Sequence, residues 1–402
     1  MTPPAAADAP TSVLIAGGGF GALETVLALR ALAGERVSIT LLAPNDELYY
    51  RPLSVREPFS EGPAQRYPLS RFVEDFELTW AKDSLRYVAP ESSSLGTTGG
   101  EQLGYDTLVL AVGAARYEQH FHGAAIFDDA RADEVLRGLI QDVDEGYARS
   151  IAFVMPLGKT WPLPLYELAL MTASRAQAAN RDDMKLYLFT PERAPLDSFG
   201  PEASDAVAEM LEQAGITFFT SSEPQVGPGQ VAPRPGAGPG QTVQVQRIVS
   251  LPELRGPDVR GLPIDHEGFI EVDDSFAVRG LDRVYAAGDA CSFPVKQGGL
   301  AAQQADTIAN TIARSAGADH PPTPRQLEIR GILLTGGRPR YLTAKLIGQS
   351  GFRSEIADEC PWPDASKVQA PYLSPYLSAL DQAREAGRDK PADPIGRYWG
   401  PP

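Results

Sequence analysis

The chain has 402 residues, of which 43% are hydrophobic and 22% charged, and its net charge is −16. This length and composition predict two or three globular domains. The negative charge argues against a nucleic-acid partner, because phosphate binding needs clustered Lys and Arg, and against electrostatic docking on an anionic membrane.

The sequence lacks the patterns of a secreted or membrane-spanning protein. It contains no run of about 18 apolar residues, so we expect no transmembrane segment. Its start, MTPPAAADAPT, has neither the basic residues nor the apolar core of a secretory signal, which favours the cytoplasm. Cys291 and Cys360 form no C-x-x-C pair. We therefore expect two free thiols, and we identify no metal site.

A glycine loop near the start predicts a dinucleotide-binding site. Residues 13–16 form a short apolar run typical of a buried parallel strand, and Gly17, Gly19 and Ala22 follow in the spacing G-x-G-x-x-G/A. The first glycine permits the tight turn, the second admits a pyrophosphate, and the third small residue keeps the helix close to the strand.

The flanking segments complete a βαβ unit. Apolar residues at helical spacing predict a helix over residues 20–33, and residues 37–42 read as the second strand. An Ala-Pro pair follows that strand, where Asp or Glu often binds a ribose hydroxyl. Either Asn45 and Asp46 take that role, or the backbone holds the ribose.

Further strands are expected at residues 78–88 and 107–112. The second of these breaks at Gly113, which would let the backbone pass close to a ligand. Between the βαβ unit and these strands, residues 45–66 mix prolines with polar and aromatic residues. We interpret them as an irregular excursion over the cofactor.

A second βαβ unit begins at Ser150, with a helix predicted over residues 166–176 and a strand over 184–189. The loop before this helix has one glycine, Gly158, and three prolines in place of a glycine fingerprint, and Thr190-Pro191 replaces the acid after the following strand. The pattern predicts a retained domain with an altered nucleotide site.

In the second half, residues 204–214 predict an amphipathic helix, and the Pro/Gly-rich residues 226–241 predict a flexible loop. A short strand at 282–287 leads to a Gly-Asp pair and then to a helix of small residues. Further on, a hairpin is expected around Gly336-Gly337.

An aromatic and aliphatic stripe lies near the end of the chain. Tyr372, Leu373, Tyr376, Leu377 and Leu380 recur at helical spacing. This helix either packs on the core or faces a membrane interface or a quinone, since Tyr and Leu suit that boundary. The second alternative would make the protein peripheral to a membrane.

Four features in order now carry a resemblance: LIAGGGFGALE, TLVLAVGAA, the degenerate central βαβ unit, and RVYAAGDACSFPVKQGGLAAQQA. Together they resemble the two-dinucleotide-binding-domain flavoproteins, the FAD-dependent pyridine nucleotide-disulfide oxidoreductase superfamily. The loop LAPNDELYYRPL is similar to that of the type II NADH dehydrogenase and sulfide:quinone oxidoreductase branch.

The resemblance implies an α/β fold with two Rossmann-like domains. The FAD-binding domain would be discontinuous, over residues 12–115 and 255–320. Residues 116–254 would form the second domain with its altered NAD site, and residues 321–402 a small C-terminal region.

The resemblance also implies the cofactor contacts. In that family the glycine loop binds the FAD pyrophosphate, the Asp of the Gly-Asp pair binds the ribityl or pyrophosphate, and the N-terminus of the later helix faces the flavin. By this match the residues expected to bind FAD are Gly17, Gly19, Phe20, Gly21, Ala22, Asn45, Arg51, Ala111, Gly113, Gly288, Asp289, Gly298, Gly299 and Leu300.

Two charged residues are candidates for catalysis. Lys296 is the first candidate for a side chain beside the isoalloxazine, and Glu167 the second, as a proton-transfer group. Each is alternatively a solvated surface charge. Cys291 is expected to be a small buried residue, and the lack of cysteines before it disfavours a sulfide mechanism with a cysteine pair.

The leading hypothesis is an FAD-dependent oxidoreductase that passes electrons from an unidentified small-molecule donor to an acceptor such as a quinone. One alternative is an enzyme that uses NAD(P)H at the altered second domain, where Lys159 and Arg193 would hold a phosphate. Another is a non-catalytic, flavin-bound interaction protein. The oligomeric state is left open.

Overall fold

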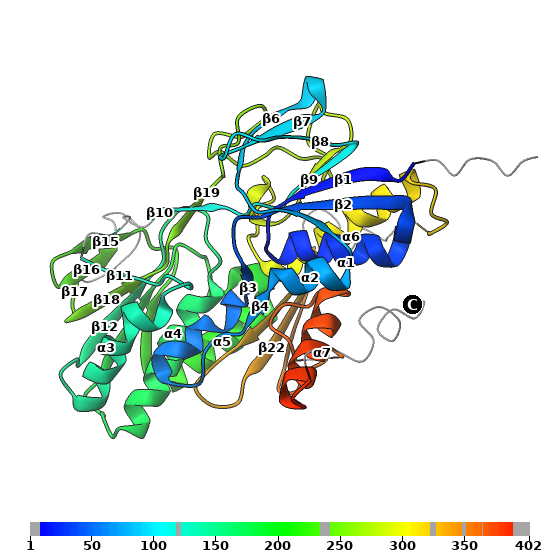
Figure 1. Ribbon diagram of the computed structural model, residues 1–402. Helices are drawn as coiled ribbons and strands as arrows, with labels where there is room; N and C mark the ends of the chain where they lie inside the picture. Colours follow the sequence, from blue (N-terminus) through cyan, green and yellow to red (C-terminus); the bar gives the residue numbers. More distant parts are fainter. Residues whose placement is uncertain are drawn as a thin grey trace, which may run out of the picture.

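The structure, a computed structural model, describes residues 9–117, 121, 123–233, 242–321, 327–347, 351–363 and 365–388. Two five-stranded parallel sheets form its frame (Figure 1). Helices and smaller sheets cover both faces of each, which is why the strands are continuously apolar rather than alternating.

The first sheet has the strand order β20-β9-β1-β2-β5. In β1, Val13 and Ile15 pack among helices on one face, whereas Leu14 and Ala16 pack against a small sheet on the other, as the two-residue period of a strand requires. The strands span Thr11–Ala16 (β1), Val37–Leu42 (β2), Thr79–Ala81 (β5), Thr107–Leu110 (β9) and Val284–Ala286 (β20).

Helices α1 and α6 pack together on one face of this sheet, and the antiparallel sheet β6-β7-β8 covers the other (Figure 1). An excursion after β2 contains the β3-β4 ladder, a long 3-10 segment (η2) and α2. These elements span Phe20–Ala33 (α1), Gly298–Ser315 (α6), Leu85–Ala89 (β6), Ser94–Thr97 (β7), Gln102–Gly104 (β8), Glu47–Tyr49 (β3), Arg51–Phe59 (η2), Arg66–Pro68 (β4) and Leu69–Asp75 (α2).

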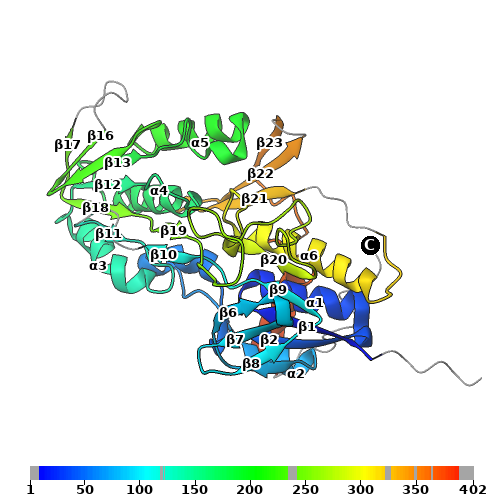
Figure 2. The same ribbon diagram turned by 90° about the horizontal axis from the view of Figure 1, so that it is seen from above.

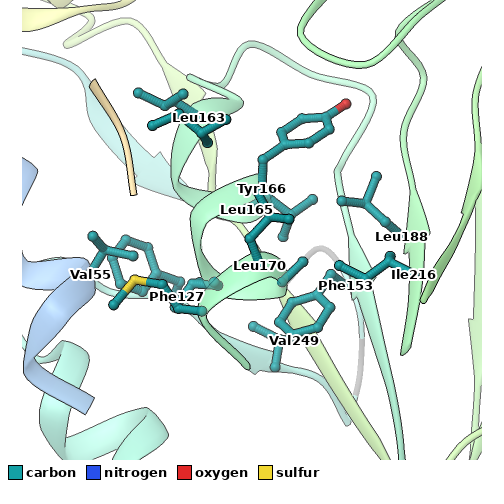
Figure 3. Packing of buried hydrophobic residues seen from close by; sticks show 14 of the residues in the cluster. Val55, Phe127, Phe153, Leu163, Leu165, Tyr166, Leu170, Leu188, Ile216 and Val249 are labelled. Atoms are coloured by element: carbon teal, nitrogen blue, oxygen red, sulfur yellow. The ribbon is translucent and has the colours of Figure 1, made fainter. Parts of the chain in front are cut away.

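The second sheet has the order β11-β18-β12-β13-β14. Helix α4 lies along its centre, with Tyr166 and Leu170 near Phe153 and Val249 of the strands (Figure 3). The sheet and its covering elements span Ala125–Ile126 (β11), Ser150–Val154 (β12), Lys185–Phe189 (β13), Ile216–Phe219 (β14), Arg247–Ser250 (β18), Ala132–Glu145 (α3), Leu163–Ala178 (α4), Pro201–Gln213 (α5), Pro224–Gly227 (β15), Gln230–Pro233 (β16) and Val243–Gln244 (β17).

A short antiparallel pair lies between the two large sheets in both views (Figure 2). It joins β10 (Ala115–Tyr117) to β19 (Glu253–Arg255). The chain therefore passes from one sheet to the other and back through adjacent strands.

The domain boundaries given above stay a prediction. The remaining 3-10 turns span Gly34–Arg36 (η1), Pro90–Ser92 (η3), Asp197–Phe199 (η4) and Gly288–Ala290 (η5).

The C-terminal part adds a three-stranded antiparallel sheet and a helix. The sheet consists of β21 (Glu328–Leu333), β22 (Arg340–Ile347) and β23 (Gly351–Ala357), and the predicted hairpin at Gly336-Gly337 joins the first two. Helix α7 (Leu373–Glu385) follows. No helix among the described residues is long and apolar enough to span a bilayer.

The stripe on α7 packs on the core rather than facing outward. Tyr376 is 1% exposed, and its ring centroid lies 5.1 Å from that of Phe72 and 5.0 Å from that of Phe76. Leu373 and Leu377 are also buried in this cluster. The structure therefore bears out the core-packing alternative for these three positions, and the interfacial alternative is wrong for them.

The predicted strand at residues 78–88 is in fact two strands, β5 and β6. Asp83 makes the break between them, because its carboxylate accepts hydrogen bonds from the backbone N–H groups of Ser84 (2.7 Å) and Gly99 (2.8 Å). This local side-chain turn competes with a continuous strand.

The predicted flexible loop at residues 226–241 is also partly wrong. Its first part lies in the β15-β16 hairpin, where Val226 is paired with Val231. Val231 is fully buried against the second sheet, which explains why this part is ordered. Residues 234–241 lie outside the described residues.

Candidate cofactor-binding site

A cavity of about 590 Å³ opens at the carboxyl ends of the strands of the first sheet. Residues that follow β1, β2, β9 and β20 line it, together with the first residues of α1 and α6. Open parallel sheets bind ligands at this edge, and the volume lies within the roughly 300–1,000 Å³ of ligand clefts.

The glycine loop after β1 forms one wall of the cavity. Gly17 has φ +131°, and a Cβ there would lie 2.2 Å from the carbonyl oxygen of Ala111. Gly19 also lines the cavity, but a Cβ there would meet no atom within 4 Å. Gly17 is therefore needed for the turn itself, whereas Gly19 leaves open space at the N-terminus of α1, where an anion is favoured.

Asp289, in the turn after β20, presents a carboxylate to the cavity. This carboxylate makes no hydrogen bond to another described residue. Burial raises its pKa, against the positive charges of Lys296 and Arg116. An acceptor of this kind fits a ligand with hydroxyl groups.

The start of α6 forms the opposite wall. Gly298 and Ala301 line the cavity, and the side chain of Gln297 caps the helix by accepting from the N–H of Leu300 at 2.8 Å. The cavity thus combines the glycine loop at the start of α1, the carboxylate of Asp289 and the N-terminus of α6. This combination of residues fits FAD.

The polar side chains of the loop after β2 lie in different places. Asn45 and Glu47 line the cavity. Asp46 instead forms an exposed ion pair with Lys82. Glu47 was not predicted from the sequence, and it is itself paired with Arg66 at 2.6 Å.

Two arginines that line the cavity share one carboxylate. Arg116 binds both oxygens of Asp129 at 2.6 Å, and Arg51 binds the same side chain at 3.1 Å. Arg116 follows the apolar run that ends at Gly113 and carries no motif of its own, so sequence reasoning missed it.

Most of the predicted cofactor residues line the cavity. They are Gly17, Gly19, Phe20, Gly21, Asn45, Arg51, Ala111, Gly113, Gly288, Asp289 and Gly298. Ala22, Gly299 and Leu300 are not in its lining. Ala22 and Leu300 are 0% and 1% exposed and pack in the core, as expected for positions that seat a helix against a sheet.

Lys296 is buried but does not line the cavity. Its ammonium lies 3.6 Å from the ring centroid of Phe269 and donates to the carbonyl of Cys291. Burial lowers its pKa, and the neighbouring Cys291 and Asp289 oppose that effect. The solvated-surface alternative is therefore wrong for this lysine.

Cys291 is fully buried, as predicted, and neither cysteine is in a disulfide.

Glu167 is likewise buried and outside the cavity lining. Its carboxylate contacts the ammonium of Lys367 at 2.5 Å and accepts from the N–H of Leu334 at 2.9 Å. Burial raises its pKa, whereas Lys367 opposes the rise. Glu167 is therefore not a surface charge. No sequence signal pointed to its partner, 200 residues away.

At the corresponding edge of the second sheet, the loop before α4 packs against β19. A Cβ at Gly158 would lie 2.3 Å from the Glu253 side chain, and the N–H of Leu254 donates to the Lys159 carbonyl at 2.7 Å. The ammonium of Lys159 is 4.0 Å from Glu267. Arg193, the other predicted phosphate ligand, pairs with Asp197.

An acid does follow β13, but it folds back onto the protein. Glu192 accepts hydrogen bonds from the hydroxyls of Tyr166 at 2.6 Å and Thr190 at 3.0 Å. Burial raises its pKa to about 7. Tyr166 is 0% exposed and occupies the start of α4. The carboxylate after β13 is thus engaged by two hydroxyl groups of the protein itself.

Comparison with known proteins agrees with this architecture. A family model for pyridine nucleotide-disulphide oxidoreductases matches residues 167–310. The mitochondrial sulfide:quinone oxidoreductase of Dictyostelium discoideum is 29% identical over 116 residues. That alignment spans 28% of this chain and only 25% of the relative.

Solved structures resemble nearly the whole chain. The sulfide:quinone oxidoreductase of Aquifex aeolicus is similar with a TM-score of 0.77 and 16% identity, over 95% of this chain and 93% of that one. NDH2 from Plasmodium falciparum, solved in complex with NADH, has a TM-score of 0.63 and 12% identity, over 83% and 89% of the two chains.

These findings confirm the predicted α/β fold and the predicted resemblance to the two-dinucleotide-binding-domain flavoproteins. The family match over residues 167–310 supports, without covering the glycine loop of the first sheet, the expected FAD cofactor and oxidoreductase class.

Proposed function

We propose that the chain is an FAD-dependent oxidoreductase that accepts electrons from a small donor other than NADH or NADPH and passes them to a quinone. The observation that carries the proposal is the contrast between the two sheets. The first presents an open cavity at its carboxyl edge, whereas at the equivalent edge of the second Gly158 packs against Glu253 and Glu192 is bonded to Tyr166.

FAD, when bound, would supply the electron transfer. The protein would supply binding and orientation. Gly17 and Gly19 would admit the pyrophosphate, Asp289 would accept from hydroxyl groups, and the N-terminus of α6 at Gly298 would favour negative charge on the flavin. The quinone acceptor is supported by the names of the two sulfide:quinone oxidoreductases that the chain resembles.

Glu167 is the proposed proton-holding group. A quinone takes up protons as well as electrons, and burial raises the pKa of this carboxyl against the opposing charge of Lys367. Lys296 is the proposed cation near the flavin. An unchanged flavin midpoint potential in Lys296→Met, measured at equal FAD content, would remove it from the site.

The proposal predicts a specific pattern of reactivity. In anaerobic stopped-flow, NADH and NADPH should not bleach the flavin in a saturable reaction, because the loop of the second nucleotide site packs against β19. Protein reduced with dithionite should be reoxidised by a short-chain ubiquinone with saturation. Reduction that saturates at micromolar NADH would overturn the proposal in favour of the NAD(P)H-dependent alternative.

A second arm of this experiment addresses the non-catalytic alternative. A flavin-bound interaction protein would react with ubiquinone no faster than free FAD at the same concentration. The location, in the cytoplasm or peripheral to a membrane, stays a prediction that sedimentation with liposomes would test.

A further inference from the structure

The position of Asp289 in the cavity depends on the backbone of its turn, because its carboxylate makes no hydrogen bond to another described residue. The sheet guides this backbone only as far as Ala287, whose N–H donates to the carbonyl of Leu110 at 2.9 Å. At Gly288 the chain leaves the sheet with φ +73°. The N–H of Gly288 therefore needs an acceptor other than the neighbouring strand.

The side chain of Gln304 on α6 supplies that acceptor. Its Oε1 accepts from the N–H of Gly288 at 2.7 Å, and Gln304 is 1% exposed. The thiol of Cys291 donates to the carbonyl of Gly288 at 3.1 Å, and its sulfur lies 3.8 Å from the same oxygen of Gln304. Both backbone polar groups of Gly288 are thus bound by buried side chains, directly before Asp289.

Helix α6 also forms the cavity wall that faces this turn. Gly298 and Ala301 line the cavity, and Gln304 follows Ala301 by three positions, on the same face of the helix. A Cβ at Gly288 would lie 3.2 Å from the Cβ of Ala301, so the turn packs closely on the helix. One helix therefore sets both the wall at Gly298 and, through Gln304, the turn that carries Asp289.

The neighbouring glutamine of α6 binds a different part of the protein. The amide of Gln303 donates to the carbonyl of Glu328 at 2.8 Å, and its oxygen accepts from the N–H of Glu328 at 2.8 Å. Glu328 begins β21 and is not among the residues that line the cavity. Two adjacent glutamines thus make the same kind of bond to the backbone, and only that of Gln304 leads to the cavity.

We infer that Gln304 is a positioning residue for the cofactor: by binding the N–H of Gly288, it holds the Asp289 carboxylate where this group accepts from the hydroxyl groups of FAD. The inference rests on the proposed function for the identity of the ligand. Gln304 is itself not in the cavity lining, so it acts through Asp289 and not by touching the ligand. Its replacement should therefore weaken FAD binding only while Asp289 is present.

A double-mutant cycle on FAD affinity tests this dependence. Protein freed of its flavin is titrated with FAD, with flavin fluorescence as the signal, for wild type, Gln304→Leu, Asp289→Ala and the double variant. We expect Gln304→Leu to raise the dissociation constant by about tenfold, the size of effect expected for one lost hydrogen bond. In the Asp289→Ala background the same substitution should raise it by less than about threefold, because coupled residues are not additive. Equal effects in the two backgrounds would overturn the inference.

Gln303→Leu is the matched control, because it removes bonds of the same kind from the same helix, but to β21. Its dissociation constant for FAD should stay close to that of wild type. A loss as large as that of Gln304→Leu would show that the packing of α6 sets the affinity, which would also overturn the inference. If Gln304→Leu does not fold, Gln304→Asn serves in its place, since it keeps the amide but withdraws the oxygen by one methylene.

Hydrogen–deuterium exchange measures the turn without any cofactor. In protein freed of flavin, the amide of Gly288 should lose protection in Gln304→Leu and keep it in Gln303→Leu. Gln304→Glu, which retains an oxygen at the same distance along the side chain, should restore the protection. Unchanged exchange at Gly288 in Gln304→Leu would contradict the inference. A wild-type protein that takes up no FAD would contradict the proposed function, whereas this measurement would still decide whether Gln304 fixes the turn.

Discussion

Replacing Gly19 with Val should give a folded protein that does not hold FAD. A Cβ at this position meets no protein atom within 4 Å, and its φ of −97° is open to any residue. The added side chain would occupy the pyrophosphate position instead. We expect flavin content below about a tenth of wild type, while the apoprotein loses only the 1–2 kcal/mol or so of a poorer helix N-cap.

Gly17→Ala is the informative partner of this variant. Its Cβ would lie 2.2 Å from the Ala111 carbonyl oxygen, and its φ of +131° is unfavourable for any other residue. Strain and overpacking together should lower the free energy of unfolding by about 3 kcal/mol or more, so this variant should be destabilised as well as lacking flavin. Absorbance of the flavin band per protein and thermal unfolding distinguish the two outcomes. A yellow Gly19→Val protein would show that the pyrophosphate binds elsewhere.

Removing Lys367 should destabilise the protein strongly and in a pH-dependent way. Lys367→Met would leave the buried Glu167 without its cation, at a cost of about 3–5 kcal/mol in the free energy of unfolding near pH 8. Burial already raises the pKa of Glu167, and without Lys367 the rise would be larger. The lost stability should therefore grow as the pH rises from 5 to 8, because a carboxyl whose pKa is raised is protonated to a greater extent at the lower pH.

Urea unfolding at both pH values measures this effect. The double variant Glu167→Gln with Lys367→Met should recover most of the loss, because no buried charge remains. Lys82→Met is the matched control. Lys82 forms an exposed ion pair with Asp46, so its replacement should lower the free energy of unfolding by less than about 1 kcal/mol. If Lys367→Met lowers the free energy of unfolding no more than this control does, and equally at both pH values, Glu167 and Lys367 do not form a buried ion pair.

The sequence predicted the part of the site that depends on local pattern. The glycine loop, α1 and β2 form one contiguous unit, so spacing alone places Gly17 and Gly19 at the cavity. The Gly-Asp pair was found through its family context. Asp83, by contrast, interrupts a strand through two backbone hydrogen bonds, which apolar periodicity does not register.

The rest of the site depends on contacts between distant segments. Lys367 reaches Glu167 across 200 residues, and Glu24 meets the start of α7 some 348 residues later. In the sequence Glu24 is one acid within an apolar helix. Its role becomes visible only when α7 packs beside α1 and brings two backbone N–H groups to this buried carboxylate.

FAD binding is tested most directly by the visible spectrum of the purified protein, with the flavin identified after denaturation. We expect a yellow protein that releases FAD rather than FMN, close to one per chain, and that keeps its flavin band when NADH is added anaerobically. A colourless protein that takes up no FAD on reconstitution would show that the cavity of the first sheet is not an FAD site.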